Sequence, residues 1–309
     1  MKIPLILGPT CSWKSAVAAR LANKAGGEVV SLDSMQIYKG LPIGTAQPGE
    51  EELALARHHL VACLELDEVW NVSRFIEVVK PLLKSIAGSG KLPVLAGGSG
   101  LYARALVYGF SLMPSDAALA EELRVDSSTE EGCDRLRAEL AASWKIPEDV
   151  ARNPRHLARA VEVTRLTGRP PWEHRRDTAT PDPAYAQFCI MPDFQKLKER
   201  IRARTAAMLE RGWVDECARA LENGLATAPT AWQALGYRDI AAFLEGKLTH
   251  GIGELQEILA NRTIQYARRQ ITWFKHQHPD AHQIRVDDFE GDVPARIIGE
   301  IEGRWTPEQ

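Results

Sequence analysis

The chain has 309 residues, of which 45% are hydrophobic and 26% charged, a composition typical of a protein with one large or two modest cores. No run of about 18 apolar residues is present, so we expect no membrane span. The five cysteines are odd in number and lack C-x-x-C spacing, which argues against a disulfide framework and a zinc site. The N-terminus leads directly into a glycine-containing loop, so we expect no signal peptide and a cytoplasmic protein.

The first predicted element is a strand over residues 3–7, followed by the loop LGPTCSWKS and by helical composition over residues 15–22. The loop matches the phosphate-binding pattern G-x-x-x-x-G-K-[ST], except that Trp13 replaces the second glycine. In such a loop, backbone N–H groups bind the anion, a lysine reaches the outer phosphate oxygens and a hydroxyl binds Mg²⁺. We favour a phosphate site over an incidental turn because a strand and a helix flank the loop. The residues in place for these roles are Gly8, Thr10, Lys14 and Ser15.

Because of Trp13, the sequence does not decide whether this loop can still bind a phosphate. Glycine is favoured at the position because a Cβ crowds the approach of the backbone to the anion, and other residues reach the required dihedrals only at a cost. The indole either turns away from the phosphates or blocks the site, and the sequence does not choose between the two.

Two more strands are predicted in the N-terminal third of the chain. Residues 28–31 lead to Asp33, and residues 92–96 end in a glycine-rich turn at residues 97–100, with a helix over residues 72–87 between them. Strands that alternate with helices indicate a parallel sheet whose ligands bind beyond the carboxyl ends of the strands. Asp33 then has two interpretations of similar weight, a helix N-cap and a carboxylate that faces the phosphate site.

Beyond Pro114 the pattern becomes almost purely helical. Helices are predicted over residues 117–123, 134–144 and 147–167, before a break at residues 168–171 and a linker around residues 181–183. A strand over residues 187–191 then resumes the α/β pattern, and two long helices follow over residues 194–223 and 252–275. We therefore expect a core formed by residues 1–115 and 184–309, with residues 116–183 as a helical insertion domain.

The charge is unevenly distributed. Between Arg152 and Arg176 there are seven arginines against two glutamates, and residues 258–279 contain no acidic residue. In the second stretch basic residues alternate with aromatic ones, as a phosphate backbone with stackable bases would require. Charge alone still favours a solvated helix face. The residues concerned are Arg262, Arg268, Arg269 and Lys275 with Tyr266, Trp273 and Phe274.

Several short motifs occur together in one order, namely GPT at Gly8, DSMQIYKG at Asp33, IGTAQP at Ile43, HHL at His58, GGSGLY at Gly97, RAVEV at Arg159, LGYR at Leu235 and YARRQITWF at Tyr266. Together they closely resemble the motifs of the tRNA dimethylallyltransferases, also called tRNA isopentenyltransferases. The resemblance runs from Leu5 to about Lys275, and its most specific blocks surround Asp33 and end at Phe274.

The resemblance implies transfer of a dimethylallyl group from dimethylallyl diphosphate to N6 of the adenosine 3′ of the anticodon, with Mg²⁺ assisting. It implies a P-loop NTPase-like α/β core with a parallel sheet and a helical insertion that contacts tRNA. The expected partners are the tRNA anticodon stem-loop and dimethylallyl diphosphate, with no membrane, and we expect a monomer.

The resemblance also assigns roles to individual residues. Asp33 matches the general base, Thr10 a residue near that base and the donor, and Arg204 an arginine that helps to hold the diphosphate beside Lys14. Ser15 is the expected Mg²⁺ ligand. The expected diphosphate-binding residues are Gly8, Pro9, Thr10, Cys11, Ser12, Trp13, Lys14 and Ser15. The expected tRNA-binding residues are Asp33, Ser34, Met35, Gln36, Ser99, Arg155, His156, Leu157, Ala158, Arg159, Trp232, Gln233, Ala234, Leu235 and Gly236.

The chain departs from the family pattern at three positions. Trp13 replaces a loop glycine, Ala120 stands where the family has an arginine that contacts tRNA, and His156 stands where many members have arginine. These changes keep open an alternative, a catalytically impaired paralogue that binds tRNA without modifying it. A third hypothesis is a small-molecule kinase or an adenylate prenyltransferase, which would not need the helical insertion or the segment at Trp273 and Phe274.

Overall fold

The computed structural model describes residues 2–109, 113–174, 180–248 and 250–305. The chain divides into two compact units, Met1–Tyr108 with Pro181–Gln309, and Gly109–Thr180. These boundaries lie a few residues before residues 115 and 183, where the sequence analysis put them. The core helix that precedes the smaller unit is α4 (Gly100–Val107). No helix in the described part of the chain is both long enough and apolar enough to cross a bilayer.

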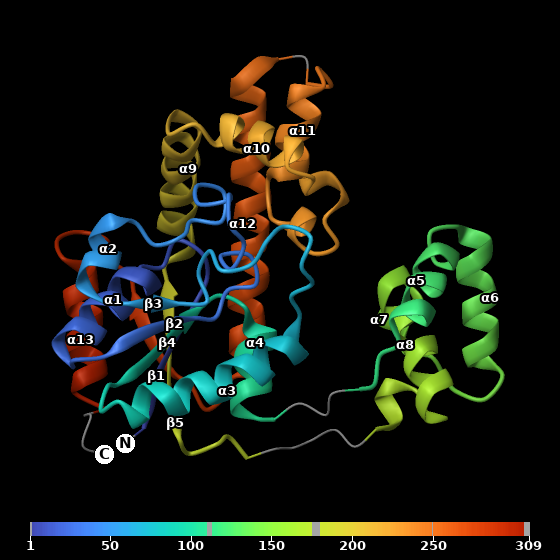
Figure 1. Ribbon diagram of the computed structural model, residues 1–309, viewed down its shortest axis with the longest axis horizontal. Coiled ribbons are helices and arrows are strands. Elements are labelled where there is room, and N and C mark those ends of the chain that lie inside the picture. The colour runs from blue at the N-terminus through green and yellow to red at the C-terminus, as the bar shows by residue number, and fades with distance from the viewer. Residues whose placement is uncertain (1, 110–112, 175–179, 249, 306–309) are drawn as a thin grey trace. The chain divides into compact units, whose positions relative to one another are not determined.

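The larger unit contains six parallel strands in the order β3-β2-β4-β1-β5-β6 (Figure 1). The predicted parallel sheet is confirmed. The central strands are short apolar runs with both faces buried, as parallel strands require. Their bounds are β1 Ile3–Leu7, β2 Glu28–Ser31, β3 His58–His59, β4 Pro93–Gly97, β5 Tyr185–Pro192 and β6 His282–Val286.

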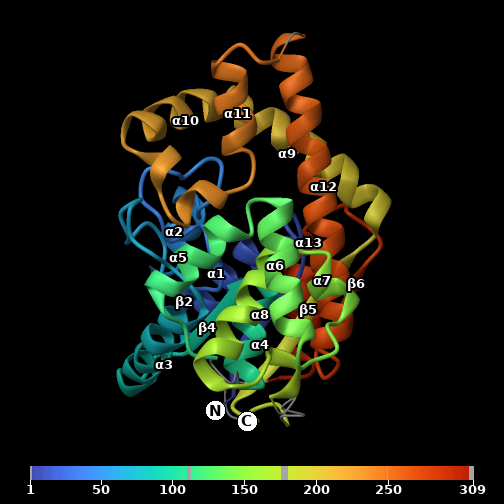
Figure 2. The same ribbon diagram turned by 90° about the vertical axis from the view of Figure 1, so that its right-hand side faces the viewer.

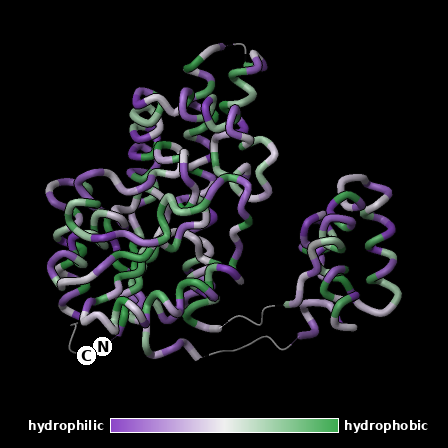
Figure 3. Tube along the Cα trace, viewed as in Figure 1, coloured by the Kyte–Doolittle hydropathy of each residue, from purple (hydrophilic) through white to green (hydrophobic). Residues whose placement is uncertain are grey.

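Helices cover the sheet and extend beyond its carboxyl edge. Helix α1 (Lys14–Lys24) packs with α13 (Val293–Glu302) in one apolar cluster, and Phe75 of α3 (Val72–Gly88) stacks on Tyr102 of α4 (Gly100–Val107). Helices α9 and α12 lie side by side (Figures 1 and 2). Hydrophobic residues concentrate in the central strands (Figure 3). The other bounds are α2 Glu50–Leu55, α9 Phe194–Glu210, α10 Trp213–Glu222, η2 Leu225–Thr227, η3 Ala231–Gln233, α11 Tyr237–Leu244 and α12 Gly251–Gln277.

Two helices predicted as continuous are interrupted. Residues 194–223 form α9 and α10, because Gly212 adopts a left-handed φ of 93° between them. Residues 147–167 form α7 (Glu148–Ala151) and α8 (Pro154–Thr167), because the ring of Pro154 disfavours helical geometry at Asn153. Asn153 Oδ1 instead caps α8 by accepting from Arg155 N at 3.0 Å. The prediction of one continuous helix was therefore wrong for both segments.

The smaller unit is helical, as predicted. Helices α5 (Ala117–Asp126), α6 (Glu130–Ala141) and α8, with the short η1 (Pro171–Glu173), surround an apolar core that includes Leu123, Leu136 and Leu157. Buried Glu162 accepts hydrogen bonds from Ser115 Oγ at 2.6 Å and from Asp116 N at 3.1 Å. These bonds fix the start of α5 against α8.

Candidate active site

The loop between β1 and α1 has the conformation of a phosphate cradle. Gly8 has a φ of 149°, and a Cβ there would lie 2.7 Å from Ile190 O of the neighbouring strand. Cys11 and Trp13 have φ values of 63° and 62°, in the left-handed region that favours glycine. Ser12 Oγ donates to Pro9 O at 2.7 Å across the loop, and α1 begins immediately afterwards at Lys14. The positive end of a helix therefore follows the loop, as an anion site requires.

Trp13 adopts this left-handed conformation, and its side chain is partly buried. The ring lies edge-on to Phe289, with ring centroids 4.7 Å apart, and the Arg200 guanidinium lies 4.2 Å from the indole centroid. It also packs against the apolar cluster of α1 and α13. The loop is thus compatible with tryptophan at the glycine position, at a backbone cost of about 1–2 kcal/mol.

Lys14 is the loop residue whose charge is most affected by its surroundings. Its Nζ donates to Pro9 O at 2.5 Å and to Ser12 Oγ at 3.5 Å. Withdrawal from water lowers the pKa of Lys14 to about 8, the Asp33 carboxylate opposes this shift, and the Arg204 guanidinium adds to it. Asp33 and Arg204 therefore both lie close enough to Lys14 to influence its charge.

Two arginines on one face of α9 contact the loop. Arg204 donates from Nη2 to Thr10 Oγ1 at 3.0 Å, and Arg200, one turn earlier, donates from Nε to Cys11 O at 3.0 Å. Among the described residues, no carboxylate forms an ion pair with Lys14, Arg200 or Arg204. Three cations without ion-pair partners among these residues are an arrangement that can bind an anion. Arg200 was not predicted, although its spacing of four residues from Arg204 was a signal.

Asp33 lies just beyond the end of β2, and the interpretation of it as a helix N-cap is wrong, because a turn and not a helix follows it. Its Oδ1 accepts from Met35 N at 2.9 Å and from Gln36 N at 3.3 Å, which fixes the turn. Its Oδ2 has no hydrogen-bond donor among the residues that the structure describes. Burial raises the pKa of Tyr266, and the charge on Asp33 raises it further. One carboxylate oxygen therefore maintains the turn while the other is free for a substrate.

Gln270 joins the loops at the ends of β1 and β4, a role that the sequence did not indicate. Its buried Oε1 accepts from Thr10 N at 2.8 Å, and its Nε2 donates to Gly98 O at 2.9 Å. A Cβ on Gly98 would lie 2.4 Å from Gln270 Nε2, so only glycine allows this approach. Ser99 Oγ accepts from Ser34 N at 3.1 Å and joins the third loop to the other two. The loops that follow β1, β2 and β4 thus form one bonded unit.

We predict that Gln270→Leu impairs the site more than it destabilises the fold. The substitution leaves Thr10 N and Gly98 O without partners, and each unpaired buried group costs about 1–3 kcal/mol. Thr10 also accepts from Arg204, so its displacement disturbs the anion site. We expect diphosphate affinity to fall by about tenfold, measured by calorimetry with pyrophosphate. In Gln270→Glu the acceptor for Thr10 N remains, but a negative charge faces Gly98 O. Unchanged diphosphate affinity in both variants would contradict the role of Gln270 in joining the two loops.

The expected metal ligand Ser15 is partly exposed at the first turn of α1. No cluster of three or more histidine, cysteine or acidic residues in the described part of the chain could hold a metal ion by itself. Mg²⁺ retains several waters and is often bound by one or two protein oxygens together with substrate phosphates. Ser15 Oγ is an oxygen ligand of this kind, so the loop fits a magnesium ion that arrives with a diphosphate.

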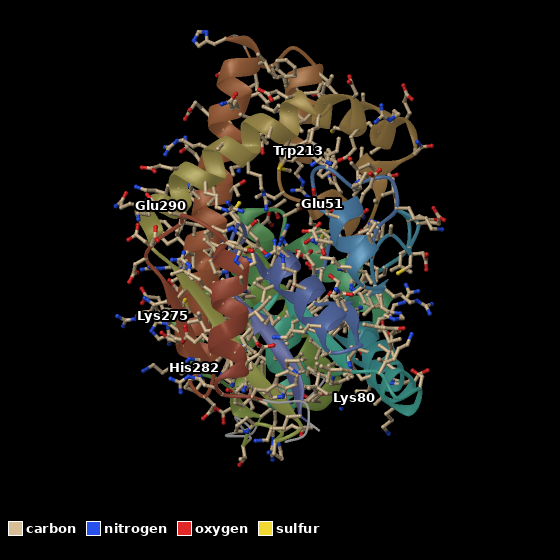
Figure 4. The ribbon with its side chains drawn as sticks, turned by 90° about the vertical axis from the view of Figure 1, so that its left-hand side faces the viewer. Glu51, Lys80, Trp213, Lys275, His282 and Glu290 are labelled. Carbon is tan, nitrogen blue, oxygen red and sulfur yellow. The ribbon has the colours of Figure 1, made fainter. Side chains whose placement is uncertain are left out.

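The expected tRNA contacts in the larger unit lie in three segments, namely residues 33–36 beyond β2, Ser99 beyond β4 and residues 232–236 before α11. Beside Asp33, Gln36 accepts from Ser31 Oγ at 3.0 Å and donates to Ala46 O at 2.8 Å, so its amide is occupied within the protein. In the third segment, Ala234 and Gly236 are buried, whereas Gln233 is exposed. A Cβ on Gly236 would meet the ring of Trp213, a residue labelled in Figure 4.

The expected contacts in the smaller unit, residues 155–159, differ in accessibility. The side chains of Arg155 and His156 are exposed, whereas Leu157 is fully buried in the core of this unit. The Arg159 guanidinium donates to Met113 O at 2.8 Å, to Pro114 O at 3.1 Å and to Glu162 at 2.6 Å. Arg155 and His156 are therefore the side chains of this segment that are free to bind RNA. Arg124, near Ala120, forms a two-point ion pair with Glu121.

A parallel sheet whose strand β1 leads into a phosphate-loop motif, with a carboxylate just beyond β2 and cations on α1 and α9, is the arrangement of a P-loop protein. The model of the IPP transferase family matches residues 36–277. The chain belongs to this family. The family, the P-loop-like fold and the class of enzyme, a transferase, are thus confirmed.

Named relatives and solved structures agree with this assignment. The chain is 40% identical over 282 residues to the tRNA dimethylallyltransferase of Thermus thermophilus, covering 90% of this chain and 91% of the relative. It is 37% identical over 292 residues to that of a Caulobacter species, covering 92% and 93%. The full-length tRNA isopentenylpyrophosphate transferase of Bacillus halodurans matches with a TM-score of 0.70 and 30% identity, covering 98% and 96%. A eukaryotic dimethylallyltransferase acting on tRNA shares the fold, with a TM-score of 0.76 and 22% identity, covering 99% and 81%.

Proposed function

We propose that this protein transfers a dimethylallyl group from dimethylallyl diphosphate to N6 of the adenosine 3′ of the anticodon in tRNA. The observation that carries the proposal is the arrangement of Lys14 at the start of α1, Asp33 just beyond β2 and Arg204 on α9, with Thr10 bonded to Arg204. An anion site beside an available carboxylate oxygen suits a reaction in which a diphosphate leaves and a proton is removed. The names of the relatives identify the donor and acceptor classes.

The donor half of the reaction requires stabilisation of the leaving diphosphate. As the bond between the allylic carbon and the diphosphate oxygen breaks, negative charge develops on the bridging oxygen. Our candidates for binding that charge are the loop amides, Lys14 and Arg204, and hydrogen bonds to the loop hold both side chains beside it. A magnesium ion on Ser15 would supply further positive charge to the same oxygens.

The acceptor half requires removal of a proton from an exocyclic amine. The nitrogen lone pair is delocalised into the purine, so attack on the allylic carbon forms the N–C bond while a base accepts the proton. Asp33 Oδ2 is our candidate for this base, because Oδ1 already accepts from Met35 N and holds the carboxyl group in place. The products are the prenylated adenosine, diphosphate and a protonated carboxyl group.

A base within an anticodon loop must leave its stack to reach such a site. Basic residues that can hold the displaced strand occur on α12, where Arg268 and Arg269 are exposed, and on α8, where Arg155 and His156 are exposed. We propose that these side chains bind the tRNA backbone. The exposed part of Trp273 offers an aromatic surface for stacking.

The direct test incubates the protein with unmodified tRNA, Mg²⁺ and radiolabelled dimethylallyl diphosphate and measures label in tRNA. Transfer to the adenosine 3′ of the anticodon, located by nuclease digestion and mass spectrometry, is the expected result. Binding of tRNA without transfer would instead support the impaired paralogue. Transfer to free adenosine monophosphate in place of tRNA would support an adenylate prenyltransferase.

A further inference from the structure

The structure gives Trp13 a set of contacts that a glycine at this position would lack. The indole contacts Phe289, which follows β6, and the Arg200 guanidinium on α9. The ring therefore contacts two segments that come from distant parts of the chain. Its packing against the cluster of α1 and α13 fixes its position further.

Arg200 is held at two points, and its remaining donors are free. Its guanidinium lies 4.2 Å from the Trp13 ring centroid, and its Nε donates to Cys11 O at 3.0 Å. The two terminal nitrogens have no acceptor among the described residues, and the side chain is exposed overall. A planar guanidinium fixed in this way presents two parallel N–H donors, the arrangement that binds phosphate oxygens best.

The anchoring matters because a free arginine is flexible. An unrestrained arginine loses rotamer freedom when it binds an anion, and that entropy reduces affinity. Here the indole restricts the side chain before any ligand arrives. The same contact braces the loop, since Arg200 bonds to the carbonyl of Cys11, one of the two non-glycine residues with left-handed φ in this loop.

We propose that Trp13 is a positioning residue that fixes Arg200 against the phosphate loop, so that Arg200 binds the diphosphate as a third cation beside Lys14 and Arg204. The inference rests on the proposed function only in taking a diphosphate as the ligand. In this arrangement Trp13 lacks the backbone freedom that a glycine would have, and its indole restricts the Arg200 side chain before a ligand binds.

The experiment uses calorimetry to measure how tightly the full chain and its variants bind inorganic pyrophosphate in the presence of Mg²⁺. The single variants are Trp13→Ala, Trp13→Gly, Trp13→Phe and Arg200→Met, and the double variant is Trp13→Ala/Arg200→Met. We expect affinity to fall about fivefold in Trp13→Ala and Trp13→Gly, from loss of the cation–π contact, and to be largely retained in Trp13→Phe. The double variant should be no weaker than Arg200→Met alone. Thermal melting should place Trp13→Gly above Trp13→Ala, since only glycine adopts the left-handed conformation freely.

A steady-state measurement separates positioning from a structural role. The KM for dimethylallyl diphosphate should rise in Trp13→Ala and Arg200→Met, while the KM for tRNA stays unchanged. Equal or tighter pyrophosphate binding in Trp13→Ala and Trp13→Gly would overturn the proposal, as would additive losses in the double variant. Pyrophosphate binding does not depend on prenyl transfer, so absence of transfer with the expected binding pattern would contradict the proposed function alone.

Discussion

Asp33→Asn is expected to lower kcat for prenyl transfer by about 10³-fold while diphosphate affinity changes by less than about threefold, because general-base catalysis contributes about 10²–10⁴-fold. The amide keeps an oxygen that can accept from Met35 N, so the turn after β2 remains. What is lost is a carboxylate oxygen able to accept the proton from N6. Single-turnover transfer to tRNA, with pyrophosphate binding in parallel, measures the two effects separately.

Asp182→Asn is the matched control, since Asp182 also accepts a backbone hydrogen bond, from Ala184 N at 2.9 Å, but lies before β5 at the opposite end of the sheet. We expect it to leave kcat within about twofold, in line with most surface substitutions. Asp33→Ala should lose both the base and the turn and melt at a lower temperature than Asp33→Asn. A kcat for Asp33→Asn within tenfold of the unchanged protein would exclude Asp33 as the base.

The local part of the site could be predicted from the sequence because each piece directly follows a strand. Gly8 follows β1, Asp33 lies just beyond β2 and Gly98 follows β4, and parallel strands place their carboxyl ends at one edge. Gln270 and Arg200 could not be placed in this way. Their hydrogen bonds to Thr10 and Cys11 span 260 and 189 residues, so they depend on how α12 and α9 pack.

The fold shows the same division between local and tertiary signals. The buried central strands were predicted within a few residues, because an apolar run between turn signals is a local feature. The edge strands β3 and β6 were not predicted, since β3 has two residues and β6 alternates exposed and buried side chains. Tertiary context also decided the orientation of Trp13, whose partner Phe289 is fixed only when the segment after β6 packs near the loop.

Donor affinity is expected to fall as pH rises above about 8, because the pKa of Lys14 is lowered to about 8 by its withdrawal from water. A bound diphosphate favours the charged ammonium, so binding takes up a proton once the free protein has lost it. The dissociation constant for dimethylallyl diphosphate should be insensitive to Lys14 below pH 8 and rise by up to about tenfold per pH unit above it. Calorimetry between pH 7 and pH 10 in buffers of different ionisation enthalpy measures both the affinity and the proton uptake.

The loss of donor affinity above pH 8 can be distinguished from unfolding, because Lys14 affects the free energy of unfolding in the opposite direction. The pKa of Lys14 is lower in the folded chain than the ordinary 10.5, so between pH 8 and pH 10.5 the unfolded chain binds more protons at this residue. Its contribution to the free energy of unfolding therefore rises with pH over the range in which donor affinity falls. Lys14→Ala should bind the donor about 100-fold more weakly, from loss of charge-assisted hydrogen bonds, and without this pH dependence. An affinity that stays constant from pH 7 to pH 10 in the unchanged protein would show that Lys14 does not hold the diphosphate as an ammonium.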